Sequence, residues 1–146
     1  MIVGFTGTRR NLTAAQFNAL CNLIQRTKVD LGHHGDCING DEIFHAAVRV
    51  VWPEATIVVH PPKNPKYRAY CTGDVILPEF PYLMRNHNIV DQIKDYGADA
   101  MLIACPKESK EKLRGGTWAT MRYARDKVLI VTIFPNGSIG YGVHNG

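Results

Sequence analysis

The sequence contains no hydrophobic run that could cross a bilayer, because its longest nearly unbroken apolar stretch covers only residues 128–134. It also shows no basic leader or cleavage site before the apolar start Ile2-Val3-Gly4-Phe5, so no secretory signal is indicated. No internal repeat or low-complexity segment is present. We therefore expect a cytoplasmic protein without a membrane partner.

Metal and disulfide signatures are absent from the sequence as well. Its four cysteines are widely separated and form no Cys-x-x-Cys pair: Cys21, Cys37, Cys71 and Cys105. None of the six histidines belongs to a His-Glu-x-x-His motif. The sequence thus favours free thiols, no metal site and no bound cofactor.

The sequence does contain enough apolar material for one core. Its 146 residues are 45% hydrophobic and 21% charged, which is typical of a globular protein, and we expect a single domain over residues 1–146. The formal net charge is +4, and residues 107–127 carry this whole excess with seven basic and three acidic side chains. Such a local excess favours a small anionic partner over nucleic acid, which needs a wider basic face. A solvated loop and helix face is the ordinary alternative for a charge run.

Strand and helix patterns alternate along the chain. Short apolar runs predict strands over residues 2–5, 31–35, 56–59, 100–104 and 128–134, and a short C-terminal hairpin strand over 138–143. Periodic segments predict helices over residues 14–28, 42–51, 81–95 and from 116 onward, and Thr13 and Gln16 have capping-box spacing before the first helix. This alternation predicts an α/β fold: a Rossmann-like three-layer sandwich with a mainly parallel five-stranded sheet and helices on both faces.

Two adjacent glycines, Gly115 and Gly116, directly precede the last predicted helix. Without Cβ atoms they let a phosphate approach the first-turn N–H groups, which have no intrahelical acceptor and lie at the positive end of the helix dipole. Arg114 and the Thr117 hydroxyl would add two side-chain donors. The sequence therefore predicts a phosphate site at this helix start, the alternative being a glycine loop that only reverses direction.

Other polar segments should reach the same edge of the sheet, since ligands of parallel α/β sheets bind beyond the carboxyl ends of the strands. The expected ligand-binding residues are Gly7, Thr8, Arg9, Gly35, Asp36, His60, Arg68, Arg85, Asn86, Arg114, Gly115, Gly116, Thr117 and Trp118. Among them, His60 could equally be a satisfied loop histidine, and a tryptophan at helical spacing is more often a core residue.

Residues 63–80 form the longest stretch without a convincing period. Long irregular loops in compact domains are often functional, so we expect this stretch to be a mobile lid over the ligand. Its Tyr67, Arg68 and Tyr70 are better candidates for stacking on a base than Trp118, because no periodic core pattern includes them.

Several of these segments form a pattern that covers nearly the whole chain: Gly7-Thr8-Arg9, His34-Gly35-Asp36-Cys37 with Gly40-Asp41, His60-Pro61-Pro62, Arg85-Asn86, Leu102-Ile103-Ala104 and Arg114-Gly115-Gly116-Thr117-Trp118-Ala119-Thr120. This pattern resembles the SLOG superfamily, which includes Rossmann-like nucleotide-binding domains of the DprA/Smf type and LOG-type phosphoribohydrolases. The resemblance implies a nucleotide or nucleotide-derived ligand with its phosphate on the Gly115-Gly116-Thr117 helix start. It also implies a homo-oligomer, either a dimer or a tetramer.

The chain departs from the LOG motif Pro-Gly-Gly-x-Gly-Thr-x-x-Glu. Alignment of the two glycines places Arg114 at the proline, Trp118 at the third glycine and Arg122 at the catalytic glutamate. An arginine stays protonated and cannot act as the carboxylate that helps an N-glycosidic bond break. The LOG mechanism therefore does not transfer to this chain.

Two main function classes follow from these observations. The leading one is a module that senses or sequesters a nucleoside phosphate or an ADP-ribose-like molecule. The alternative is an N-glycosidic-bond hydrolase or transferase acting on nucleoside phosphates, with Asp36, Asp41 and Glu79 as candidate catalytic carboxylates. Ordinary roles for these acids are a turn acceptor, a helix N-cap and a solvated loop acid, respectively. Single-stranded DNA binding ranks last, because the basic excess is small and local.

Overall fold

The computed structural model describes residues 1–142, so the last residue of the expected 138–143 strand lies outside the described part. In chain order the elements are β1 (Ile2–Gly7), α1 (Ala14–Arg26), β2 (Leu31–His34), α2 (Gly40–Val51), β3 (Thr56–Val59), the 3-10 helix η1 (Pro65–Tyr67), β4 (Val75–Ile76), α3 (Tyr82–Ile93), the 3-10 helix η2 (Lys94–Asp99), β5 (Ala100–Cys105), α4 (Gly116–Ala124), β6 (Leu129–Ile133) and β7 (Ile139–Gly142).

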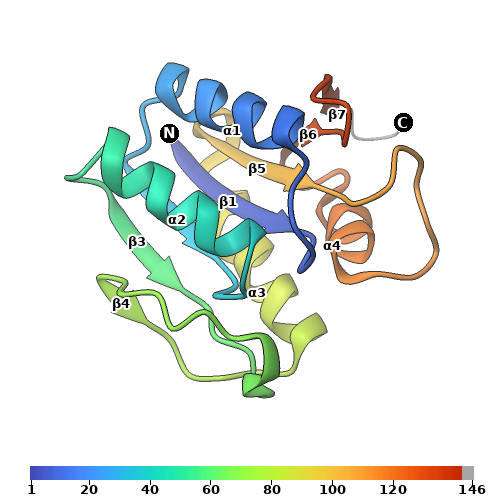
Figure 1. Ribbon diagram of the computed structural model, residues 1–146. Coiled ribbons are helices and arrows are strands. Elements are labelled where there is room, and N and C mark those ends of the chain that lie inside the picture. The colour runs from blue at the N-terminus through green and yellow to red at the C-terminus, as the bar shows by residue number, and fades with distance from the viewer. Residues whose placement is uncertain (143–146) are drawn as a thin grey trace.

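All the strands belong to one sheet with the order β4-β3-β2-β1-β5-β6-β7 (Figure 1). Neighbouring strands are parallel except β6 and β7, which form an antiparallel hairpin. The expected α/β fold with a mostly parallel sheet is confirmed. The sheet has seven strands, however, and is wider than the five strands and short hairpin strand that the sequence pattern predicts.

The strand that the pattern misses is β4, which lies within residues 63–80 and pairs with β3. A strand of two residues is too short to show an alternating hydrophobic pattern. A polar side chain fixes its position instead. Asp74 accepts a hydrogen bond from Ile57 N at 2.8 Å, and Arg49 Nη2 lies 3.0 Å from the same carboxylate oxygen. Part of the expected lid is therefore an edge strand of the sheet.

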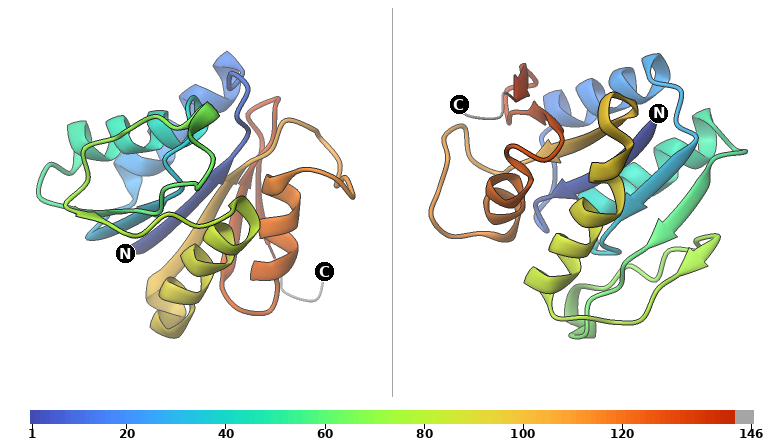
Figure 2. Two further views of the ribbon diagram at one scale, coloured as in Figure 1. Left: turned by 90° about the horizontal axis from the view of Figure 1, so that it is seen from below. Right: turned by 180° about the vertical axis from the view of Figure 1, so that it is seen from behind.

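Two apolar clusters lie on the sheet, and successive residues of β5 contribute to different clusters. Ile103 belongs to the cluster that packs under α1 and α2, whereas Leu102 belongs to the cluster that packs under α3 and α4. Side chains of successive strand residues point to opposite faces of a sheet. The two views in Figure 2 show the same arrangement, with α1 and α2 on one side of the strands and α3 and α4 on the other.

Helix α1 begins with the capping box expected from Thr13 and Gln16. The Gln16 side chain is buried, and its Nε2 donates to Pro106 O at 2.8 Å and to Ile133 O at 2.9 Å. These two bonds tie the start of α1 to the residue that follows β5 and to the last residue of β6. They fix where the chain leaves β5 for the loop that leads to α4.

Among the described residues, every helix is too short or too polar to span a bilayer.

Candidate functional site

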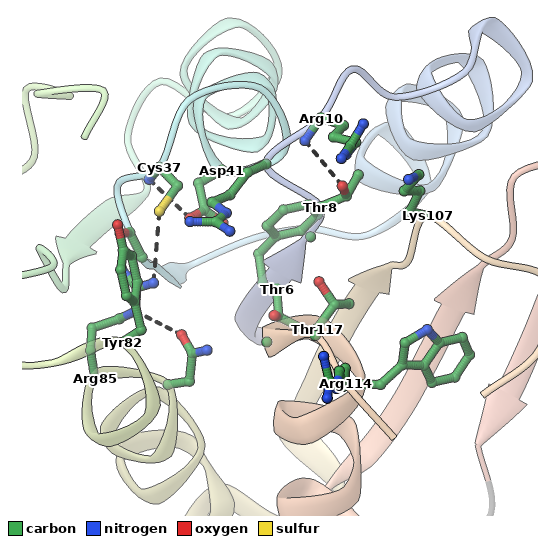
Figure 3. Close-up of a pocket in the computed structure, with 18 of the residues that line it drawn as sticks. Thr6, Thr8, Arg10, Cys37, Asp41, Tyr82, Arg85, Lys107, Arg114 and Thr117 are labelled. Carbon is green, nitrogen blue, oxygen red and sulfur yellow. Dashed lines mark hydrogen bonds between the residues drawn. The ribbon is translucent and has the colours of Figure 1, made fainter. Parts of the chain in front are cut away.

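The strand order reverses between β1 and β5, which are neighbours in the sheet although β5 is far along the chain. In open parallel sheets such a switch point leaves a crevice beyond the carboxyl ends of the strands. A cavity of about 460 Å³ lies there (Figure 3). Its lining comes from Phe5, Thr6, Gly7, Thr8, Arg9, Arg10, Gly35, Cys37, Asp41, Tyr82, Arg85, Asn86, Lys107, Glu108, Arg114, Gly115, Gly116, Thr117 and Trp118.

Most of the residues expected at the site share this cavity. The lining includes Gly7, Thr8, Arg9, Gly35, Arg85, Asn86, Arg114, Gly115, Gly116, Thr117 and Trp118, together with the candidate carboxylate Asp41. The expectation that all of the predicted residues share one crevice is wrong for four others: Asp36, His60, Arg68 and Glu79 are outside its lining.

Asp36, Arg68 and Glu79 form an ion-pair network away from the cavity. The Asp36 carboxylate is fully buried, lies 3.0 Å from Arg68 Nε and accepts a hydrogen bond from Cys71 N at 2.8 Å. Arg68 also pairs with Glu79 at 2.7 Å. These contacts connect residues 63–80 to the end of β2, so Asp36 accepts from a distant loop rather than from its own turn.

His60 is buried beside β2. Its Nε2 lies 2.8 Å from Nδ1 of His33, and burial lowers the pKa of His60 to about 3. The backbone oxygen of His60 accepts a hydrogen bond from Arg85 at 3.2 Å. This residue is therefore a neutral histidine bonded to His33 and Arg85, and it lies outside the cavity lining.

The predicted phosphate site lies at the start of α4 and opens into the cavity. Gly115 caps the helix with φ +108°, a conformation that favours glycine, and its carbonyl oxygen accepts from Ala119 N at 3.1 Å. No heavy atom would lie within 4 Å of a Cβ added to Gly115. The N–H groups of residues 116–118 precede the first intrahelical bond and form the helix's positive end.

Asn86 presents a donor to this helix start. Its Oδ1 accepts a hydrogen bond from Arg85 Nε at 2.7 Å, so the amide NH₂ group points the other way. A Cβ on Gly116 would lie 3.6 Å from Nδ2 of Asn86. Side-chain and backbone N–H groups from two helices therefore face the same part of the cavity.

Arg85 is buried, and its guanidinium group is largely occupied by other contacts. It donates to the carbonyl oxygens of Gly35 and His60, to Asn86 Oδ1 and, at 3.7 Å, to Cys37 Sγ. A Cβ on Gly35 would approach Arg85 Nη1 to 2.6 Å, so glycine is needed at that position to admit the guanidinium. Arg85 thus joins α3 to the ends of β2 and β3, and it contributes a positive charge to the cavity wall.

Asp41 is the buried carboxyl of the cavity. It is the second residue of α2, and its Oδ2 accepts from Cys37 N at 3.0 Å. The expected alternative of an N-cap is wrong, because Asn39 precedes the helix and its N–H bonds Glu42 at 3.4 Å. Burial raises the pKa of Asp41 to about 6, while the nearby Arg85 acts to lower it. The group therefore changes protonation state close to neutral pH.

Sequence reasoning missed seven of the lining residues: Phe5, Thr6, Arg10, Cys37, Tyr82, Lys107 and Glu108. Arg10 and Lys107 follow strands β1 and β5 closely, so the rule that points to strand ends could have found them. Cys37 follows β2 in the same way, and burial raises the pKa of its thiol to about 11. No sequence signal marks Tyr82, which sits at the first position of α3.

Tyr82 and Arg9 form the rim of the cavity near α3, and Tyr67 contacts Arg9 from outside the lining. The Arg9 guanidinium carbon lies 4.4 Å from the ring centroid of Tyr67 and 5.6 Å from that of Tyr82. Arg85 approaches the same Tyr82 ring at 5.3 Å. These cation–π contacts give the rim an aromatic surface of the kind that stacks on planar groups.

Trp118 is a core residue, the ordinary interpretation of a tryptophan at helical spacing, rather than a residue that stacks on a base. It is 5% exposed, packs in the apolar cluster under α4 and donates from Nε1 to Glu108 Oε1 at 2.9 Å. Its indole ring therefore supports the loop that leads from β5 to α4. It leaves little surface for a base.

Residues 63–80 do not reach the cavity lining, which consists entirely of described residues. Their backbone is bonded to the loop after β2, with Ile38 N donating to Tyr67 O and Ala69 N donating to Asp36 O, both at 2.8 Å. The loop over residues 106–115 contributes Lys107, Glu108, Arg114 and Gly115 to the lining instead. The expected lid is thus a tethered segment of the sheet's edge.

Arg122 holds the loop that does border the cavity. Its guanidinium donates to Lys112 O at 2.8 Å and to Leu113 O at 3.0 Å, and it pairs with Glu111 at 3.1 Å. Arg122 therefore fixes the loop just before Arg114. It does not line the cavity.

Three potential metal ligands, His34, His45 and Cys71, lie within 4.8 Å of one another away from the cavity. His34 Nδ1 accepts from Asp36 N at 3.0 Å, so its Nε2 carries the proton and donates to His45 Nδ1 at 2.9 Å. A metal on Nε2 would move that proton onto Nδ1, against the Asp36 N–H. Hydrogen bonds from Asp36 N to His34 and from His34 to His45 therefore account for the positions of the two histidines.

Comparison of the chain with models of known protein families, with curated proteins and with solved structures gave no match. The fold and the site define an α/β protein with a mostly parallel sheet and a polar, cationic cavity at its topological switch point.

Proposed function

We propose that this protein binds a nucleotide or nucleotide-derived ligand, either a nucleoside phosphate or an ADP-ribose-like molecule, and acts as a sensor or sequestering protein. The observation that carries the proposal is the helix start at Gly115 and Gly116, which lines the cavity with first-turn N–H groups that have no intrahelical acceptor and with the Asn86 amide beside them. A helix N-terminus with glycines is a common binding site for phosphate.

The charges of the lining favour an anionic ligand. Five basic side chains border the cavity, Arg9, Arg10, Arg85, Lys107 and Arg114, against the two acids Asp41 and Glu108. Glu108 is bonded to Trp118, and Arg85 is engaged with backbone carbonyls. Arg114 and Lys107 are exposed, and Arg114 lies at the α4 start, where it can reach a phosphate.

The size of the cavity suits a nucleotide-sized molecule. Ligand pockets range over roughly 300–1,000 Å³, and this cavity has about 460 Å³. With phosphate at α4, the rim formed by Tyr82 and Arg9 would meet the planar part of the ligand. This orientation supports a nucleotide over a simple inorganic anion.

The leading proposal is binding without turnover. At the position that aligns with the catalytic glutamate of the LOG motif this chain has Arg122, which has no carboxylate and bonds the loop before α4. One observation favours the alternative, an N-glycosidic-bond hydrolase or transferase. Asp41 lines the same cavity, and its raised pKa of about 6 would suit a general acid or base near neutral pH. Asp36 and Glu79 are paired with Arg68, so they no longer compete for this role.

A thermal-shift panel of nucleoside mono-, di- and triphosphates and ADP-ribose-type molecules tests the proposal. A ligand at about a hundred times its dissociation constant should stabilise the fold by roughly 2.7 kcal/mol, which raises the melting temperature by several degrees. The ligand found should be recovered intact after long incubation with the protein. Free base that appears with the parent and not with Asp41→Asn would instead establish the glycosidase.

The remaining parts of the proposal rest on the SLOG resemblance and on the sequence. They are a cytoplasmic location, a dimer or tetramer, and no nucleic-acid or membrane partner. Analytical ultracentrifugation tests the oligomeric state directly, and a single species at the mass of one 16.3 kDa chain would remove that part of the proposal.

A further inference from the structure

Asp41 places a carboxyl group in a cavity whose charged lining residues are mainly basic and so favour anions. Among the described residues it belongs to no ion pair, whereas the other lining acid, Glu108, is bonded to Trp118. Its carboxylate would repel a phosphate bound nearby. The part of the ligand that meets Asp41 must therefore donate hydrogen bonds and not carry negative charge.

Local structure does not require a charged group at this position. The backbone N–H groups of Cys37 and Gly35 contact the Asp41 carboxyl, and an uncharged asparagine oxygen could accept from both. These contacts also leave free about two of the roughly four lone-pair sites of a carboxylate. Asp41 thus keeps acceptor capacity on the wall of the cavity that α2 forms.

The position of Asp41 relative to the phosphate site gives the ligand a direction. In Figure 3, Asp41 and Cys37 lie on one side of the cavity, and Thr117 and Arg114 at the α4 start lie on the other. A sugar phosphate has this polarity, with an anion at one end and hydroxyl groups at the other. Two vicinal hydroxyls match the two oxygens of one carboxylate.

We propose that Asp41 accepts hydrogen bonds from the vicinal hydroxyls of the ligand's ribose, so that the site selects ribose phosphates over 2-deoxyribose phosphates. This inference rests on the proposed function, since it needs the phosphate at α4. It extends that function by naming the sugar and the residue that recognises it.

The probes for this inference carry no base, so the identity of the base does not matter. Ribose 5-phosphate, 2-deoxyribose 5-phosphate and inorganic phosphate are titrated into the ¹⁵N-labelled protein, and dissociation constants are taken from amide shifts. The parent should bind ribose 5-phosphate about ten times more tightly than its 2-deoxy analogue, because a charged acceptor left without its donor is costly. Inorganic phosphate should bind at α4 in all variants.

Asp41→Ala should bring the two sugar phosphates to within about twofold of each other without weakening inorganic phosphate. Asp41→Asn serves the same comparison if the alanine variant does not fold, and Asp99→Ala is the control, an exposed acid at the end of η2. Equal affinities of the parent for the two sugars, or a preference that persists without Asp41, would overturn the inference alone. Absence of binding by all three probes would overturn the proposed function together with it.

Discussion

Replacement of Asp41 by asparagine should make the protein more stable at pH 8 while impairing its site. Burial raises the pKa of this carboxyl in the folded protein from the ordinary 3.8 to about 6. A carboxyl whose folded pKa is raised contributes stability that is fully present below pH 3.8 and is lost as the pH rises through about 6. Above pH 6 the folded protein therefore carries a buried charge that the unfolded chain solvates freely.

The size of this effect follows from the difference between the two pKa values. At roughly 1.4 kcal/mol for each pH unit, the interval from 3.8 to about 6 corresponds to about 3 kcal/mol. Asparagine stays neutral at every pH, so its gain over the parent should grow by about 2 to 3 kcal/mol between pH 4 and pH 8. If asparagine accepts more weakly from the N–H groups of Cys37 and Gly35, the resulting loss of stability is the same at every pH and cancels in this difference. Arg85 and Asp36 are the charged neighbours that influence Asp41.

Urea unfolding followed by circular dichroism at pH 4, 6 and 8 measures the difference, provided that the slope with denaturant is unchanged. Asp74→Asn is a pH-independent control, because the Ile57 N–H and Arg49 lower the pKa of Asp74, so that this carboxyl is ionised in the folded and the unfolded protein above about pH 4. The difference in stability between that variant and the parent should stay nearly constant from pH 4 to pH 8. A gain for Asp41→Asn that is the same at all three values would refute the claim that Asp41 holds an unfavourable charge in the cavity.

Three further predictions concern the surroundings of the site. Arg114→Ala should weaken binding of the panel ligand about tenfold, as expected for a charge-assisted contact, with Arg26→Ala on α1 as a matched control; equal affinities by calorimetry would place the anion elsewhere. Arg68→Ala leaves the buried Asp36 without its ion-pair partner, so it should lower the free energy of unfolding by about 3 kcal/mol in urea titrations. Ligand affinity, measured without urea where the variant is folded, should not change. A specific loss of affinity would restore Arg68 to the site. Hydrogen exchange over residues 106–115 should slow when ligand is added while residues 63–80 stay unchanged, and the reverse pattern would restore the lid interpretation.

Local patterns were enough to predict the element types and the position of the helix start. The alternation of apolar runs and periodic segments predicted α1 to α4 and the main parallel strands, and the strand-end rule brought Gly7, Asn86 and Gly116 together correctly. These features depend on periodicity and on the topology of parallel sheets, which a single sequence carries.

Contacts between distant residues could not be predicted in this way. Residues 63–80 have no period because Asp36 and Asp74 hold them through polar contacts to β2 and β3. Arg85 is placed correctly in the cavity, but its Nη1 donates to the backbone carbonyls of Gly35 and His60, which only the fold brings near it. The same holds for Arg122, whose acceptors lie in the loop before α4.

The central claim is that the first turn of α4 holds a phosphate group, and amide shifts on titration with inorganic phosphate test it most directly. The largest shifts in the parent should fall on residues 116–118 and on the Asn86 side chain. Gly116→Val places a branched side chain next to Asn86 and should abolish these shifts. Ala14→Val introduces the same valine at the first position of α1 and should leave them unchanged. Shifts that centre elsewhere in the parent, or that persist in Gly116→Val, would contradict the account.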